Sequence, residues 1–336
     1  MSPRESRRIP LPRSLYLEVT NRCNLKCRTC LRYRGMKEEP RDLSLDEIKH
    51  IVGQVPELNR AALHGIGEPL LNTELADIIR YLKGKDVYVF FNSNGLLLNQ
   101  KRADELLESG LDELRVSLDA ATPSTYARVR GSTDFVRVVR NIEVLAQVRN
   151  ANHGSNPKIS AWMVATADNV EDLPEMIELA ARVGIDEVYL QRLVFPTDGP
   201  GKGLAVRQKA ITGPPQPIAD ILQKGMSLSR QLGVSLMASG LVSPTKSLSN
   251  GSREPAPWRQ CRRPREVAYV TAWGNVLPCC IAPFSSVDYG SLILGNVYTE
   301  PFDEIWRGEK YCAFREMHQS FDPPGCCSGC GTEWSL

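Results

Sequence analysis

The sequence predicts an α/β protein: a partial (β/α)6 TIM-like barrel with a small C-terminal domain. Short apolar runs typical of buried strands alternate with amphipathic helical segments, which is the pattern of βα units around a parallel sheet. Six such units make three quarters of an eight-stranded barrel, so we expect a curved sheet that stays open at one side. The predicted strands lie at residues 15–20, 60–66, 86–91, 113–118, 158–165 and 187–194.

Helix signals follow the strands. Ser44 and Glu47 form a capping box at the start of the first helix. Further helices are expected at residues 73–82, 103–109, 122–149, 172–183 and 218–232. We divide the chain into a solvated arm (1–14), the barrel (15–195), a linker rich in Pro and Gly around one helix (196–257) and the C-terminal domain (258–336).

Composition limits the functional classes. A net formal charge of +2 over 336 residues, without a basic face, argues against a dedicated nucleic-acid binder. No apolar run is long enough to span a bilayer, so no membrane partner is expected. Ten cysteines without a signal peptide favour a reducing compartment in which thiols bind metals. We therefore expect a cytoplasmic protein.

Cys23, Cys27 and Cys30 stand within eight residues, directly after the first predicted strand. Active sites of parallel sheets form at this carboxyl end of the strands. Three thiolates would leave one iron of a four-iron cluster open to an outside ligand. A zinc knuckle, a disulfide with a spare thiol and unrelated buried cysteines are the alternatives, although zinc spacings favour paired C-x2-C units.

The C-x3-C-x2-C spacing after a first strand resembles the signature of the radical S-adenosylmethionine (SAM) superfamily. The resemblance implies that SAM chelates the open iron of a 4Fe-4S cluster and is cleaved to a 5′-deoxyadenosyl radical, which abstracts a hydrogen atom from the substrate. Thr29 stands where the family usually has an aromatic residue.

Four further motifs resemble SAM-binding elements of that family. Gly65-Ile-Gly-Glu68 is similar to its GGE motif, and a glycine backbone can approach a ligand closely. Residues 92–95 and 117–119 are similar to its ribose and SLD elements, although Asn, Ser and Asp also serve as plain turn residues. Arg192 is an alternative to Gln191 on the sixth strand. The implied SAM contacts are Gly65, Gly67, Glu68, Ser93, Asn94, Ser117, Asp119, Arg130 and Gln191.

The other seven cysteines lie at the C-terminus. A hairpin with a turn at Gly274-Asn275 would carry Cys279 back toward Cys261. The spacing resembles the opening and central pairs of the SPASM domain, in the shorter form called twitch. The resemblance implies one auxiliary 4Fe-4S cluster, while a structural zinc suits four thiolates equally. The implied ligands are Cys261, Cys279, Cys327 and Cys330, with Cys326 as an alternative to Cys327.

A fully ligated second cluster suits an electron acceptor, which favours an oxidation. The resemblance to twitch dehydrogenases of aminoglycoside biosynthesis implies a radical SAM dehydrogenase for a small polar metabolite, with flavodoxin or ferredoxin as electron donor. The alternatives are a sugar-acid decarboxylase, a peptide maturase, an iron-sulfur electron carrier, or an epimerase with Cys280 or Cys312 as hydrogen donor. His64, at the mouth of the barrel, is a candidate base.

Overall fold

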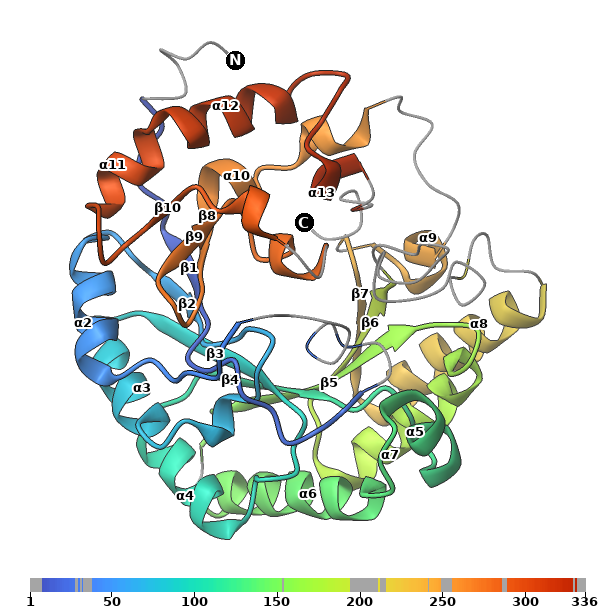
Figure 1. The fold of residues 1–336 in the computed structure, drawn as a ribbon. Coiled ribbons are helices and arrows are strands. Elements are labelled where there is room, and N and C mark those ends of the chain that lie inside the picture. Colours follow the sequence, from blue (N-terminus) through green and yellow to red (C-terminus); the bar gives the residue numbers. More distant parts are fainter. Residues whose placement is uncertain are drawn as a thin grey trace.

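A computed structural model describes residues 8–27, 30, 32, 38–152, 154–193, 211, 216–240, 242–248, 256–285, 289–328 and 330. Its strands form one curved sheet surrounded by helices (Figure 1). The order along the sheet is β10-β9-β8-β1-β2-β3-β4-β5-β6-β7. The strands are β1 (Ser14–Leu17), β2 (Arg60–Ala62), β3 (Tyr88–Ser93), β4 (Glu113–Ser117), β5 (Lys158–Ala165), β6 (Glu187–Arg192), β7 (Ser235–Ala238), β8 (Val267–Val270), β9 (Asn275–Leu277) and β10 (Gly295–Asn296).

The six predicted parallel strands are confirmed as β1 to β6, and two further parallel strands, β7 and β8, flank them. β7 pairs in parallel with β6, although it lies in the segment that we expected to be a linker. Only one of its four residues is buried, so the apolar signal was weak. β8, from the C-terminal domain, pairs in parallel with β1. The sheet of the barrel therefore continues into that domain.

The helices cover the outer face of the sheet. The predicted long helix over 122–149 is two helices, because Gly131 adopts a φ of +69° directly after α5. The capping box is confirmed, with the Glu47 backbone N–H donating to Ser44 Oγ at 3.2 Å. The helices are α2 (Leu45–Gly53), α3 (Leu75–Lys83), α4 (Gln100–Glu108), α5 (Pro123–Arg130), α6 (Phe135–Ala151), α7 (Leu173–Val183), α8 (Gln216–Leu232), α9 (Pro244–Leu248), α10 (Arg263–Glu266), α11 (Phe302–Arg307), α12 (Glu309–His318) and α13 (Gly325–Ser328).

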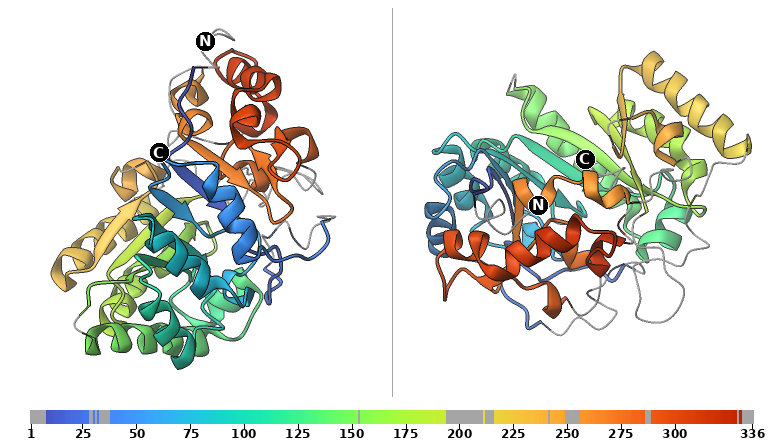
Figure 2. Two further views of the ribbon diagram at one scale, coloured as in Figure 1. Left: turned by 90° about the vertical axis from the view of Figure 1, so that its left-hand side faces the viewer. Right: turned by 90° about the horizontal axis from the view of Figure 1, so that it is seen from above.

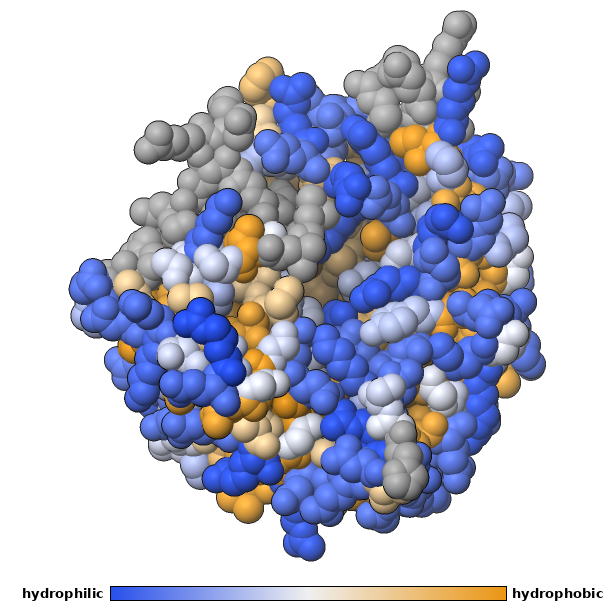
Figure 3. All heavy atoms as spheres, turned by 180° about the vertical axis from the view of Figure 1, so that it is seen from behind, coloured by the Kyte–Doolittle hydropathy of each residue, from blue (hydrophilic) through white to orange (hydrophobic). Residues whose placement is uncertain are grey.

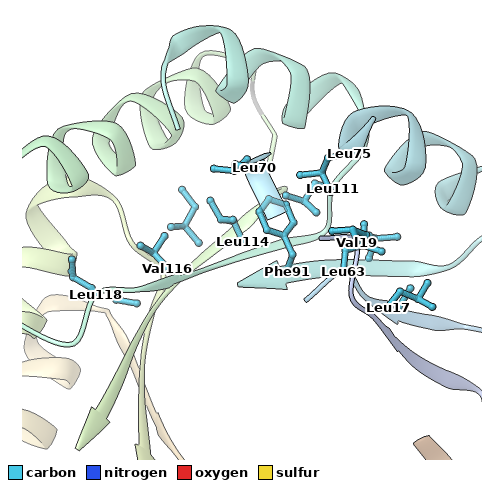
Figure 4. Packing of buried hydrophobic residues seen from close by; sticks show 14 of the residues in the cluster. Leu17, Val19, Leu63, Leu70, Leu75, Phe91, Leu111, Leu114, Val116 and Leu118 are labelled. Atoms are coloured by element: carbon cyan, nitrogen blue, oxygen red, sulfur yellow. The ribbon is translucent and has the colours of Figure 1, made fainter. Parts of the chain in front are cut away.

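The main core lies between the sheet and these helices. Figure 4 shows Phe91, Leu114 and Val116 pointing from β3 and β4 toward the helical layer. All three are fully buried. Burial of apolar side chains on this face leaves the opposite face of the same strands to line the inside of the barrel.

The C-terminal domain packs against the start of the chain. Its β8–β9 hairpin is confirmed, with Gly274 at a φ of +77° in the turn. α11 and α12 lie side by side next to the N-terminal segment (Figures 1 and 2). The buried Trp306 donates its Nε1–H to the Pro10 carbonyl at 2.9 Å. The described end of the N-terminal arm is therefore attached to the C-terminal domain at Trp306, while Arg8, Pro10 and Arg13 are exposed.

The molecular surface is polar on most of the face opposite to that of Figure 1. Figure 3 shows hydrophilic residues over most of that face, with apolar residues in small groups and a hollow near its middle. Among the described helices, none is long and apolar enough to cross a membrane.

Candidate active site

The three cysteines after β1 lie in one loop at the carboxyl end of the sheet. Cys23, Cys27 and Cys30 are half-buried and are not joined in disulfides, and Thr29 is outside the described residues. Burial raises the pKa of the Cys23 thiol to about 11, and the charges of Glu68, Cys27 and Cys30 raise it further, against a backbone N–H from Leu25. Thiolates this close repel one another until a cation lies between them. The three residues therefore fit three irons of a cluster.

Gly67 supports the backbone of this cysteine loop. A Cβ atom on Gly67 would stand 2.1 Å from the Thr20 carbonyl oxygen and 2.7 Å from that of Arg22. The neighbouring Glu68 donates its backbone N–H to the Arg22 carbonyl at 2.7 Å. Only glycine fits so close to another backbone. The loop after β2 thus fixes the chain immediately before Cys23.

The Glu68 carboxylate links the loops after β2 and β3. It is buried, and it accepts hydrogen bonds from Ser93 Oγ at 2.7 Å, the Asn94 backbone N–H at 2.7 Å and the Leu70 backbone N–H at 3.2 Å. Asn94 Nδ2 donates to Asn24 Oδ1 in the cysteine loop at 2.7 Å. These polar groups already have protein partners and do not line the cavity inside the barrel that is described next. Their contact with SAM stays a prediction.

A cavity of about 640 Å³ occupies the inside of the barrel. Ser117, Asp119, Arg130 and Gln191 line it, together with the alternative residue Arg192. Four of the predicted SAM-binding side chains are therefore brought together, from β4, α5 and β6. The volume is typical of sites for small ligands.

Asp119 and Arg130 form a largely buried ion pair in the wall of this cavity. Arg130 donates to Asp119 Oδ2 at 2.9 Å, and the Val164 backbone N–H donates to Asp119 Oδ1 at 2.8 Å. Asp119 has a φ of +60°, a conformation that is rare outside glycine, asparagine and aspartate. The pair joins the ends of β4 and β5 to the end of α5.

His64 and Cys280 also line the cavity, whereas Cys312 does not. Burial, with the nearby Arg115 guanidinium, lowers the pKa of His64 to about 4, so its imidazole is neutral at pH 7. Cys280 is hydrogen-bonded to Tyr16 of β1, whose pKa is raised mainly by burial and then by the Cys280 charge. Cys312 lies on α12, with its thiol 3.4 Å from the Arg307 carbonyl oxygen.

A second group of thiols gathers in the C-terminal domain. Burial raises the pKa of Cys279 well above its usual value, and the charges of Cys280, Cys326, Cys330 and Cys261 raise it further. Cys326 Sγ and Cys327 Sγ are 3.9 Å apart, so both remain candidates for one ligand position.

The candidate ligands of this second group are all thiols. Within the described residues, no three Cys, His, Asp or Glu side chains converge as the ligands of a single metal ion do. Thiolates are the usual ligands of iron-sulfur clusters, so the donor set of Cys261, Cys279, Cys330 and Cys326 or Cys327 suits such a cluster by its chemistry.

Two features of the cavity wall were not predicted from the sequence, although Tyr189 stands on the same strand face as Gln191, where it could fill the barrel. Trp162 and Tyr189 stack with their ring centroids 4.0 Å apart. Arg115 lies over Trp162 and pairs with Glu113 at 2.9 Å. The alternation of polar with apolar residues along β4 and β5 was the available signal, because alternate residues of a strand point to opposite faces.

The family model described as the radical SAM superfamily matches residues 17–180, and the SPASM model, described as an iron-sulfur cluster-binding domain, matches residues 261–331. The chain belongs to the radical SAM superfamily. This radical SAM protein accordingly binds a 4Fe-4S cluster and SAM, and its SPASM domain implies auxiliary iron-sulfur binding. A single auxiliary cluster stays a prediction.

Similar curated proteins align along nearly the whole chain. The tungsten-containing aldehyde ferredoxin oxidoreductase cofactor-modifying protein of Pyrococcus furiosus is 25% identical over 331 residues, covering 93% of this chain and 85% of its own. Mycofactocin maturase MftC of Mycolicibacterium smegmatis is 28% identical over 333 residues, and the alignment covers 97% of this chain and 77% of MftC.

Solved structures confirm the fold. Streptococcus suis SuiB, bound to its precursor peptide SuiA, superposes with a TM-score of 0.69 at 16% identity, covering 93% of this chain and 68% of SuiB. BtrN in complex with AdoMet and 2-DOIA has a TM-score of 0.50 at 20% identity, and the superposition covers 95% of this chain and 93% of BtrN. At these identities the likeness concerns the fold alone.

Proposed function

We propose that this radical SAM enzyme oxidises a peptide at one of its C–H bonds inside the barrel cavity. The observation that carries the proposal is the composition of the cavity wall. Ser117, Asp119 and Arg130 line one part of it, and Cys280, adjacent to the candidate cluster ligand Cys279, lines another. A group bound in the cavity would lie between the two sites.

The relatives favour a peptide over the small polar metabolite that we expected. MftC is named a maturase, and it aligns with 97% of this chain. The cavity volume suits one or two side chains of a peptide, the remainder of which would stay outside the barrel. The pairing of β8 with β1 also supports an oxidation, since it joins the domain with the second thiol group to the barrel.

The chemistry divides between the cofactors and the chain. Cys23, Cys27 and Cys30 would hold the cluster that would supply the electron for reductive cleavage of SAM. The C-terminal cysteines would hold an auxiliary cluster that would accept a second electron from the substrate. The proton that leaves with the second electron needs a base. His64 is neutral and lines the cavity, so it is placed to accept that proton.

Epimerisation of a peptide residue is a second candidate, favoured by the Cys280 thiol in the cavity wall. In that reaction the substrate carbon radical takes a hydrogen atom from Cys280 on the opposite face. An external one-electron donor and a proton would then restore the thiol.

The test is an anaerobic assay with reductant, SAM and synthetic peptides encoded by short reading frames beside the gene. Oxidation predicts peptide-dependent 5′-deoxyadenosine and a product lacking two hydrogen atoms. Epimerisation predicts unchanged mass in H2O and one deuterium in D2O. If a small polyol stimulates SAM cleavage and none of the peptides does, the peptide proposal is wrong and the dehydrogenase hypothesis is favoured.

A further inference from the structure

Glu18 follows β1 and carries a buried carboxylate with 1% of its surface exposed. Its Oε1 accepts hydrogen bonds from two distant parts of the chain, the Ile66 backbone N–H at 2.9 Å and the Tyr269 hydroxyl at 3.0 Å. Its Oε2 accepts the Ala272 backbone N–H at 3.1 Å. One side chain therefore connects the barrel with the C-terminal domain.

The groups bound to Glu18 belong to the elements that shape the two cysteine sites. Ile66 lies in the loop 65–68, which packs through Gly67 against the backbone next to Cys23. Tyr269 lies on β8 and Ala272 just after it, in the hairpin that leads to Cys279. The Glu18 carboxylate thus adds a side-chain link between the auxiliary domain and the loop beside Cys23, next to the backbone pairing of β8 with β1.

The packing at Gly65 makes this connection tight. A Cβ atom on Gly65 would stand 2.4 Å from Glu18 Cγ and 2.6 Å from the Tyr269 hydroxyl oxygen. The Glu18 backbone N–H also donates to the Val270 carbonyl at 2.9 Å. Burying a carboxylate costs free energy unless hydrogen bonds compensate it. Loss of one donor to Glu18 therefore shifts the carboxylate and the other groups that bond to it.

We propose that Glu18 is a positioning residue that makes the loop 65–68, and with it the SAM-cluster site, depend on the seating of the auxiliary domain. SAM affinity then falls when the hairpin is displaced, even though Tyr269 lies outside the SAM site. The two sites are coupled in free energy, and the coupling is reciprocal.

Tyr269→Phe tests the proposal in the reconstituted full-length enzyme, because it removes only the hydroxyl that bonds Glu18. The readout is the SAM dissociation constant, taken from the SAM-dependent change in the electron paramagnetic resonance (EPR) spectrum of the reduced enzyme, with iron content measured in parallel. We expect roughly tenfold weaker SAM binding at unchanged iron content. Tyr289→Phe is the matched control, because that hydroxyl bonds Glu38 instead, and it should leave the SAM affinity unchanged.

A double-mutant cycle tests the coupling itself. Cys261→Ala, which disrupts the auxiliary site, should weaken SAM binding in the wild-type background and have much less effect in Tyr269→Phe. If the two substitutions weaken SAM binding by factors that simply multiply in the double variant, the sites are not coupled and the proposal is wrong. Unchanged SAM affinity in Tyr269→Phe also overturns it. If Tyr269→Phe loses its clusters, Glu18→Gln replaces it, and unchanged SAM affinity there is equally decisive against the proposal.

Discussion

Replacing Gly67 with alanine should abolish the SAM-cluster site and spare the rest of the protein. The added Cβ would stand 2.1 Å from the Thr20 carbonyl oxygen, and ordinary contact begins near 3.4 Å, so one backbone must move by 3.4 − 2.1 = 1.3 Å. The Thr20 carbonyl oxygen belongs to the backbone, so it cannot rotate away as the end of a side chain could. Such a shift breaks the 2.7 Å hydrogen bond from Glu68 to Arg22, and overpacking of this kind costs about 1–3 kcal/mol.

The assay is iron content and EPR of the anaerobically reconstituted Gly67→Ala variant, together with reductive SAM cleavage. We expect loss of the SAM-responsive EPR signal and of 5′-deoxyadenosine formation, while the auxiliary signal persists. Gly53→Ala is the control, since it lies at the end of α2 with no atom within 4 Å of the added Cβ, and it should behave as wild type. A Gly67→Ala variant that cleaves SAM at the wild-type rate would refute the packing argument.

Three further predictions follow from single side chains. Asp119→Asn removes the negative charge that faces the Arg130 guanidinium in the cavity wall, so chemical denaturation should show a loss of about 3 kcal/mol of stability. The control is Asp77→Asn at an exposed ion pair, which should change the stability by less than about 0.5 kcal/mol. Burial raises the pKa of Glu18 from its usual 4.5 to about 7, so the folded state binds the proton more tightly than the unfolded state does. Protonation of Glu18 therefore stabilises the fold by about 3 kcal/mol below pH 4.5, and this stabilisation is lost as the pH rises through 7. The unfolding midpoint of the wild type should therefore fall across that range, and a fall of equal size in Glu18→Gln would contradict this assignment. Cys280→Ala should retain product formation if the reaction is an oxidation, and should abolish deuterium uptake if it is an epimerisation.

Much of the barrel was predictable because its strands are continuous apolar runs ended by turn residues. The strand predicted at 86–91 is one example. The turn at Gly274 was predictable for another reason, because its positive φ favours glycine. β7 was missed because a short, mostly exposed strand carries little pattern. The pairing of β8 with β1 was missed because no local signal reports a contact between residues so far apart in the chain.

In the candidate site, too, the residues with a local sequence signal were predictable and those defined by tertiary contacts were not. Cys23, Cys27 and Cys30 were found because a local spacing carries the ligand set. Glu18 was not found, since its partner Tyr269 lies 251 residues away and its role depends on tertiary structure. Glu68 was assigned to SAM from its motif, whereas the structure shows that its carboxylate bridges two loops. Motif resemblance located the residue, but only the three-dimensional contacts show which atoms are already engaged.

We expect the chain to hold a SAM-binding cluster on its first three cysteines and an auxiliary cluster on the C-terminal ones. The most direct measurement is iron, acid-labile sulfide and zinc per chain after anaerobic reconstitution, in the wild type and in a Cys23, Cys27 and Cys30 to Ala variant. We expect about eight irons in the wild type, about four in the variant, and no zinc in either. About four irons with one zinc in the wild type would contradict this expectation, because the C-terminal site would then be structural and no electron acceptor would stand beside the cavity.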